Sequence, residues 1–250
     1  MTHNYKLTIA YDGTAYCGWQ VQPNGITIQE EMQRHIATIL RQEVILIGSG
    51  RTDSGVHALG QVANFNFPDP ISLYRFQGSL NGLLPADIRV LNIAEVPLKF
   101  HSQHTATGKT YHYHLHLDRV ENPFNRLYRH HIKENISLPI LKQAANVFLG
   151  THDFTSFANE AHKGSAAIDA VRTLHRLDII EQDGGVRLEL EADGFLYKMV
   201  RNIVGTLLET ATQKRAIAEI PEIFLAKDRR RAGQAAPSKG LFLVKVEYPY

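Results

Sequence analysis

The sequence predicts an α+β fold, and three observations carry that prediction. Segments with the alternation of half-buried strands are interleaved with segments of helical periodicity, so strands and helices follow one another in mixed order. Two strand-like segments, 171–180 and 186–192, flank Asp183-Gly184-Gly185, which is a hairpin signal. Hydrophobic residues make up 44% and charged residues 21% of the 250 residues, which are the proportions of an ordinary globular protein.

The first part of the chain contains six predicted elements. Tyr5 to Tyr11 alternates as a strand and stops at Asp12-Gly13. Thr27 and Glu30 form a capping box that begins a helix reaching about Arg41. The remaining elements are strands over 44–47, 61–67 and 88–96 and a helix over 72–81. This order, strand-helix-strand-strand-helix-strand, is that of a split ferredoxin-like unit.

A second unit of similar element order is predicted after residues 97–100. Ser137 caps a helix, and Gly150 is placed to end it. Besides the hairpin, this part contains predicted strands over 107–117 and 241–248 and helices over 195–211 and 217–227. We therefore expect two domains, residues 1–100 and residues 101–250. The similar order hints at two copies of one unit, although no sequence repeat proves it.

Composition excludes several classes of protein. No apolar stretch approaches the roughly 18 residues that a membrane span needs, and the N-terminus lacks the layout of a signal peptide. Cys17 is the only cysteine, which excludes an internal disulfide and a cysteine-based zinc site. We expect a cytoplasmic protein. The net charge of +2 permits an anionic partner without demanding one.

The loop from Gly48 to Ala58 is the first candidate site, because it lies between two predicted strands, where functional residues are common. It matches neither the dinucleotide nor the P-loop fingerprint, nor the nucleophile elbow. It does place Arg51 and His57 on either side of Asp53. A nearby cation would keep this carboxylate ionised, as nucleophilic or general-base work requires. On the residues alone, a catalytic loop and a purely structural turn both remain open.

The strand over 107–117 has two contrasting faces. His112, His114 and His116 share one face, where they indicate either a metal site or a solvated or RNA-facing surface; the second is favoured because no carboxylates are at hand to orient metal ligands. Tyr111 and Tyr113 share the opposite face. Tyr111 is either a core residue with its hydroxyl at the rim or a functional residue.

Two further features are cationic. Arg201 borders the apolar stripe of the 195–211 helix, with Lys198 and Asn202 expected to point further outward. An arginine in that position either extends to water or reaches a buried anion such as Asp53. The run over 227–231 contains three arginines after the last predicted helix; it is either solvated surface or part of a phosphate-binding patch.

Six sets of residues, spread in order over essentially the full length, are similar to the TruA-type tRNA pseudouridine synthases. The central one is Gly50-Arg51-Thr52-Asp53-Ser54-Gly55-Val56-His57-Ala58, which resembles the active-site motif of that family. The others are 11–13 with 18–20, 81–85, 148–157, 199–205 and 240–244.

The resemblance implies an enzyme that isomerises uridine to pseudouridine at positions 38, 39 and 40 of the tRNA anticodon stem-loop, with no cofactor and no metal. It implies two ferredoxin-like or RRM-like halves, whose antiparallel sheets join across a central basic cleft, and a homodimer. Asp53 falls on the catalytic aspartate, Tyr111 on the substrate-contacting tyrosine and Arg201 on the arginine paired with the aspartate. Arg51 resembles the arginine that helps to flip the target base. His57 is assigned only an RNA-contact or loop-ordering role.

One departure from the family pattern concerns Gln103, which stands where the family commonly has an arginine and so removes a charge from one RNA contact. Two other functions are considered beside the synthase. A non-catalytic RNA-binding protein on the same scaffold would explain the basic cluster and the tyrosines but not the Asp53 loop. A metal-dependent hydrolase would use the three histidines of the 107–117 strand.

Overall fold

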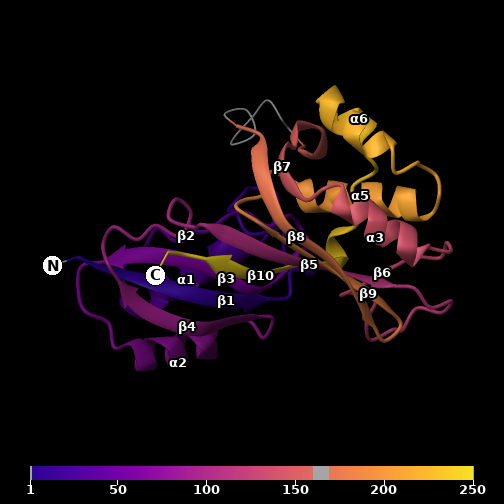
Figure 1. Ribbon diagram of the computed structural model, residues 1–250. Coiled ribbons are helices and arrows are strands. Elements are labelled where there is room, and N and C mark those ends of the chain that lie inside the picture. Colours follow the sequence, from indigo (N-terminus) through magenta and orange to yellow (C-terminus); the bar gives the residue numbers. More distant parts are fainter. Residues whose placement is uncertain (1, 160–168, 250) are drawn as a thin grey trace. The chain divides into compact units, whose positions relative to one another are not determined.

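The structure, a computed structural model, describes residues 2–159 and 169–249 (Figure 1). Its contacts divide the chain into two compact units. Unit 1 comprises Met1–Thr107 and Phe242–Tyr250, and unit 2 comprises Gly108–Leu241. Each unit combines a largely antiparallel sheet with helices, which confirms the predicted α+β class. No helix in the described ranges is long and apolar enough to cross a membrane.

The sheet of unit 1 is built around two long strands, β1 and β3, which pair antiparallel with Lys6 opposite Asn64. β4 flanks β1 in antiparallel order, and the C-terminal strand β10 pairs parallel with β3 through Phe242 and Leu243. A short strand, β2, also pairs with β3. The strands are β1 (His3–Tyr11), β2 (Ile47–Gly48), β3 (His57–Phe67), β4 (Ile88–Val96) and β10 (Leu241–Glu247).

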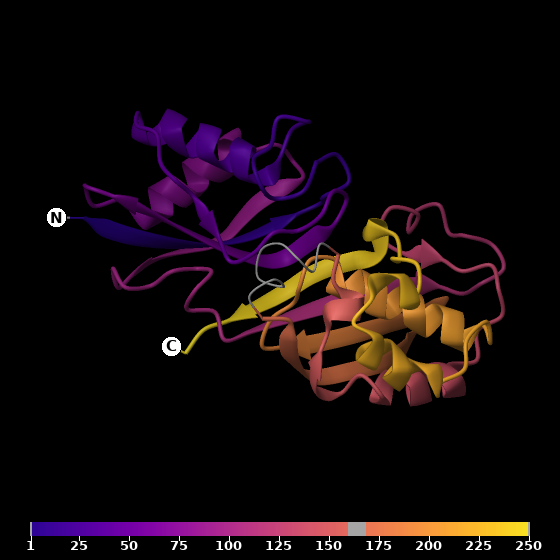
Figure 2. The ribbon, with the colours of Figure 1, turned by 90° about the horizontal axis from the view of Figure 1, so that it is seen from above.

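Two helices, α1 (Ile28–Leu40) and α2 (Leu73–Leu83), cover one face of this sheet, side by side in Figure 2. The predicted cap of α1 is confirmed, since the Thr27 side chain accepts a hydrogen bond from the Glu30 N–H at 3.3 Å. The apolar stripe of α1 is buried against the sheet, as its periodicity predicts.

The sheet of unit 2 has the order β5-β9-β8-β7, with every neighbouring pair antiparallel. The predicted hairpin is confirmed: β8 and β9 are joined at Asp183-Gly184, where Gly184 has φ 68°. A two-residue strand, β6, pairs parallel with β5. The strands are β5 (Gly108–His116), β6 (His130–His131), β7 (Gly150–Asp153), β8 (Val171–Gln182) and β9 (Gly185–Ala192).

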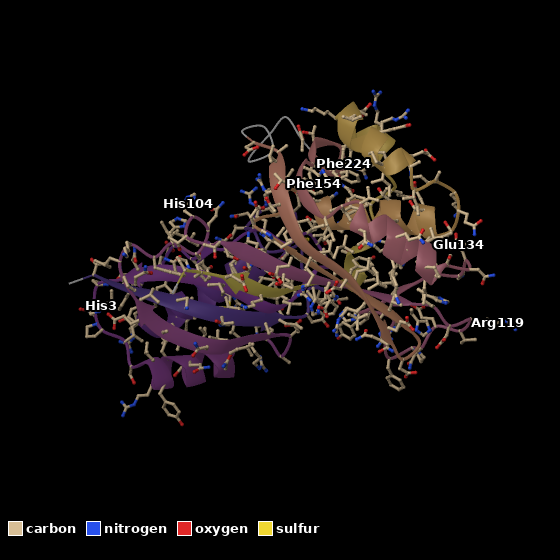
Figure 3. The ribbon with its side chains drawn as sticks, viewed as in Figure 1. His3, His104, Arg119, Glu134, Phe154 and Phe224 are labelled. Carbon is tan, nitrogen blue, oxygen red and sulfur yellow. The ribbon has the colours of Figure 1, made fainter. Side chains whose placement is uncertain are left out.

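Helices α3 (Leu138–Asn146), α5 (Met199–Ala211) and α6 (Glu219–Ala226) gather beside this sheet (Figure 1). An aromatic cluster packs α6 against the segment that follows β7. Phe154 and Phe224, labelled in Figure 3, meet edge to face with ring centroids 5.3 Å apart, and Phe157 also packs against Phe224 at 4.9 Å. The 3₁₀ turns that connect these segments cover Thr155–Phe157, Arg229–Arg231 and Ser238–Gly240.

The predicted buried strand over 44–47 is wrong in most of its length, because β2 covers only Ile47 and Gly48. Ile45 is 80% exposed, while its neighbours Val44 and Leu46 are buried. The backbone of Leu46 bonds to helix side chains instead of a strand: Gln29 donates to its carbonyl at 2.7 Å and its N–H donates to Gln33 at 3.1 Å. The apolar content of this segment predicts a strand. In the structure, side chains of α1 form the hydrogen bonds to the Leu46 backbone that a neighbouring strand would otherwise form.

The start of α5 and the orientation of Asn202 also differ from prediction. The helix begins at Met199 rather than near residue 195, because Lys198 adopts a left-handed conformation with φ 58°. Asn202 is fully buried instead of pointing outward. Its side-chain amide donates to the Phe157 carbonyl at 2.6 Å and accepts from Arg229 at 2.8 Å, so buried partners replace water.

Candidate active-site loop

Asp53 lies in unit 1 on the loop between β2 and β3. Its side chain is half-buried, between an exposed Arg51 and an exposed Ser54. The Asp53 carbonyl accepts a hydrogen bond from the Val56 N–H at 3.1 Å, and Gly55 turns the chain with φ 73°. The loop therefore fixes the backbone of Asp53 and leaves the residue only half-buried.

Four buried polar side chains lie beneath the loop; Tyr11, Ser49, Thr52 and Gln61 are each at most 6% exposed. The Gln61 amide accepts from the Ser49 hydroxyl at 2.7 Å and donates to the Gly50 carbonyl at 3.0 Å. The Tyr11 and Thr52 hydroxyls lie 2.8 Å apart in a hydrogen bond. These bonds hold residues 49–52, the four residues immediately before Asp53.

The segment 11–20 closes over the same loop from the other side. The Trp19 N–H donates to the Thr52 carbonyl at 3.1 Å. Gly18 has φ 85°, and a Cβ there would lie 2.4 Å from the Thr52 oxygen; a Cβ at Gly13 would lie 2.0 Å from the Val56 oxygen. Only glycine permits so close an approach of two backbones. The two sequence motifs therefore form one local structure.

His57 begins β3 at the end of the loop and is only 1% exposed. Its Nδ1 accepts from the Gly13 N–H at 3.1 Å and lies 3.1 Å from Asp12 Oδ1, and its ring stacks on Phe242 with centroids 4.6 Å apart. Of the two roles predicted for His57, this burial favours loop ordering, because the ring has almost no surface to offer an RNA.

Tyr111 and Arg201 belong to unit 2. Tyr111 lies on β5, is nearly buried, and meets the Phe195 ring edge to face at 5.1 Å. Arg201 lies on α5, half-buried, and its Nε donates to the Ala236 carbonyl at 2.7 Å. A protein acceptor thus orients this guanidinium, which does not simply extend to water. The pairing of Arg201 with Asp53 of unit 1 stays a prediction.

The three histidines of β5 have separate partners. His112 Nε2 lies 3.7 Å from Glu189, and His114 Nδ1 lies 3.3 Å from Gln182 Oε1. His116 Nε2 is 2.8 Å from the Val120 carbonyl, and this ring is 97% buried, with 3% of its surface exposed, contrary to the predicted solvated face. Among the residues that the structure describes, no group of three or more histidine, cysteine and carboxylate side chains is placed to hold a metal ion.

The charge run after α6 divides into structural and exposed members. Arg229 is half-buried and donates to Asn159 at 3.2 Å as well as to Asn202. Arg230 is exposed but paired with Asp228 at 2.7 Å. Lys227 is paired with Asp153 at 2.7 Å. Three of the four cations are thus already engaged within unit 2, which weakens the interpretation of the run as a phosphate-binding patch. Sequence reasoning missed the Asn202 and Arg229 contact because its partners are distant along the chain.

Comparison with known proteins gives consistent results. A family model described as "tRNA pseudouridine synthase" matches residues 7–104 and 144–249, which include Asp53 and Arg201 but not Tyr111. The chain is 61% identical over 247 residues to tRNA pseudouridine synthase A 1 of Protochlamydia amoebophila, covering 98% of this chain and 96% of that protein. It is 43% identical over 245 residues to tRNA pseudouridine synthase A of Acetivibrio thermocellus, covering 98% and 99%.

Among solved structures, a chain of a Cbf5-Nop10-Gar1 complex matches with a TM-score of 0.38 and 13% identity, over 95% of this chain and 57% of that one. A likeness this weak carries no argument about function.

Proposed function

The chain belongs to the TruA-type tRNA pseudouridine synthases, and from that premise we propose that it converts uridine to pseudouridine at positions 38, 39 and 40 of the tRNA anticodon stem-loop, with Asp53 as the essential carboxylate. The observation that carries the proposal is the Asp53 loop itself. Hydrogen bonds hold the residues on both sides of Asp53, and Asp53 itself is only half-buried. Rigid support beneath an accessible reactive group is what a catalytic residue needs.

The reaction needs the target nucleotide to leave its stack, because a stacked uridine hides its glycosidic bond; extrusion costs a few kcal/mol. Arg51 is exposed at the edge of the loop, two residues from Asp53. Its planar cationic group is suited to fill the space that the base vacates and to stack there. We assign Arg51 this role.

Asp53 then acts as nucleophile or base on the uridine, whose glycosidic C–N bond breaks. The freed uracil rotates and rejoins C1′ of the ribose through C5; C5 loses its proton and N1 takes one up, so substrate and product are isomers and no electron acceptor is needed. Tyr111 is assigned to stack on the flipped base, and the edge-to-face contact of its ring with Phe195 supports this role by limiting how the ring can turn. Arg201 is assigned to favour the ionised form of Asp53.

Asp53→Asn tests the reaction with the smallest change in shape. We expect the conversion of tRNA uridines to fall by at least about 10³-fold, since a single nucleophile or base usually carries that much, while tRNA affinity and thermal stability stay near wild type. Pseudouridine mapping of a tRNA transcript after incubation with the purified chain measures both rate and position. Asp69→Asn, on an exposed turn of the same unit, is the matched control and should keep full activity.

The same measurement separates the alternatives. Wild-type turnover by Asp53→Asn would overturn the assignment of this carboxylate. Tight tRNA binding by the wild-type chain without any isomerisation would favour an RNA-binding protein on this scaffold. Pseudouridine outside the anticodon arm would contradict the proposed positions.

The proposal includes a homodimer and a cytoplasmic location. The family resemblance supports the homodimer, and sedimentation of the purified chain tests it directly. The cytoplasmic location follows from a tRNA substrate, since the enzyme must meet the tRNA pool. Fractionation of cells that express the tagged chain tests that location.

A further inference from the structure

We infer that Tyr11 is a positioning residue for Asp53, acting through the Thr52 hydroxyl as part of a buried brace made of Tyr11, Ser49, Thr52 and Gln61. The inference rests on the proposed role of Asp53. It adds residues that never meet the substrate, because their side chains are almost completely buried. The 2.8 Å bond from Tyr11 to Thr52 ends one peptide unit away from the catalytic candidate.

Polar side chains are an unusual choice for the brace if its only role is to fill buried space. Burying a hydroxyl or an amide costs free energy unless it is hydrogen-bonded, and apolar side chains would fill the same space without that cost. Here the bonds of the polar side chains converge on a single short segment. Gln61 binds Ser49 and the Gly50 carbonyl, and Tyr11 binds Thr52. Their common result is a fixed backbone over residues 49–52.

Tyr11 has a counterpart that shows what a structural tyrosine does on the same strand. Tyr5 lies on the same face of β1, six residues earlier, and is also fully buried. Its hydroxyl donates to the Asp69 carbonyl at 3.3 Å and accepts from the Ile71 N–H at 2.9 Å. Tyr5 therefore anchors a connection away from Asp53. The two tyrosines form a matched pair that differs in the loop that each one holds.

The Tyr11 hydroxyl acts as a hydrogen-bonding group and not as an acid or a base. Burial raises the pKa of Tyr11 well above its usual value, and the hydrogen bonds to Thr52 and Gln61 oppose that rise only in part. The hydroxyl is therefore protonated near neutral pH and available as a hydrogen-bonding group. Loss of this group should change the placement of Asp53 and leave the shape of the pH–rate profile unchanged.

Misplacement of a reacting group by about 1 Å costs roughly 10²-fold in rate. We therefore expect Tyr11→Phe to lower the single-turnover rate constant for pseudouridine formation by about 10- to 100-fold. The dissociation constant for tRNA should stay within about 2-fold of wild type, because the brace offers no surface to RNA. Tyr5→Phe also removes a buried hydroxyl, so its melting temperature should fall in the same way, but its rate constant should not.

Thr52 provides an independent test of the same bond. Thr52→Val keeps the shape and removes the hydroxyl, and should reproduce the rate loss of Tyr11→Phe; Thr52→Ser keeps the hydroxyl and should recover most of the rate. If both side chains act through one bond, Tyr11→Phe combined with Thr52→Val should lose no more than either alone. The Thr52 series keeps the inference testable even if Tyr11→Phe folds poorly.

The outcomes separate this inference from the proposed function. An inactive Asp53→Asn together with a fully active Tyr11→Phe or Thr52→Val would overturn the brace and leave the proposed function standing. Equal rate losses in Tyr11→Phe and Tyr5→Phe would also overturn it, because any buried hydroxyl would then matter equally. An active Asp53→Asn, or a wild-type chain that forms no pseudouridine, would overturn the proposed function and this inference with it.

Discussion

At the scale of single residues, the burial of His57 favours a role in ordering the loop over a role in contacting RNA. Its ring accepts a hydrogen bond from the Gly13 N–H and is closed off from solvent. We expect His57→Leu to lower the free energy of unfolding by about 1–3 kcal/mol, the cost of leaving a buried N–H without its acceptor. Chemical denaturation of the purified variant measures this loss.

The exposed His104, labelled in Figure 3, supplies the control for that substitution. His104→Leu should change the free energy of unfolding by no more than about 0.5 kcal/mol, as is usual at the surface. A His57→Leu variant with normal stability but weakened tRNA binding would contradict the loop-ordering role and restore the RNA contact as the explanation.

A candidate site whose residues are close together in the sequence could be predicted. Contacts between residues far apart in the sequence could not. The Arg51–Asp53 loop stands out because its chemistry is contiguous in the sequence. The bond from Tyr11 to Thr52 spans 41 positions, and no periodicity connects them. Asn202 is predicted to face outward because it lies off the apolar stripe of its helix. Its partners Phe157 and Arg229 come from two other segments of unit 2.

At the scale of elements, strand β5 predicts a dependence of stability on pH. Burial, with a smaller contribution from nearby cationic groups such as Arg129 and Arg187, lowers the pKa of His114 to about 4. An unfolded histidine titrates near 6.5. Above that pH both states are neutral, and His114 does not affect stability. As the pH is lowered from about 6.5 to 4, His114 becomes protonated in the unfolded chain but not in the folded one. The free energy of unfolding therefore decreases as the pH decreases.

His114→Gln removes this titration and should therefore lose about 1 kcal/mol less stability than wild type when the pH falls from 7 to 5, a figure discounted for partial exposure. Urea denaturation at several pH values measures the difference. The comparison needs no assumption about the stability of the variant at pH 7, because only the change with pH is used. Parallel pH profiles for both proteins would show that His114 titrates normally in the folded state.

Elements with a complete local signal were predicted well, and those that depend on a distant partner were not. The cap and stripe of α1 and the glycine turn between β8 and β9 are contained in their own segments. The apolar run at 44–47 has the composition of a strand, but the backbone of Leu46 is hydrogen-bonded to the side chains of Gln29 and Gln33. Strands of two and four residues, such as β6 and β7, are too short to show alternation.

At the scale of the whole molecule, the last strand joins the C-terminal residues to the unit that contains residues 1–107. β10 follows every element of unit 2 in sequence, yet Phe242 and Leu243 pair with β3 of unit 1. The pairing was not predictable, since strand periodicity says which residues are buried but not which strand lies alongside. The consequence is that unit 1 cannot complete its sheet until the end of the chain is available.

Removal of residues 242–250 should therefore damage unit 1, although most of that unit lies at the other end of the chain. Leu243 and Val246 are buried, and Phe242 stacks on His57. Each large apolar side chain removed from the core costs about 1.5–3 kcal/mol, a serious loss against a typical total of about 5–15 kcal/mol. We expect amide hydrogens of β1 and β3 to exchange much faster in the truncated chain, and pseudouridine formation to be lost.

Removal of residues 249–250 alone is the matched control, because β10 ends at Glu247. This shorter truncation should leave amide exchange and activity unchanged. If the longer truncation instead left β3 protected and accelerated exchange only within unit 2, the assignment of β10 to unit 1 would be contradicted. The expected result would connect the C-terminal strand with the candidate site. β10 pairs with β3 and packs Phe242 against His57, which ends the loop that carries Asp53.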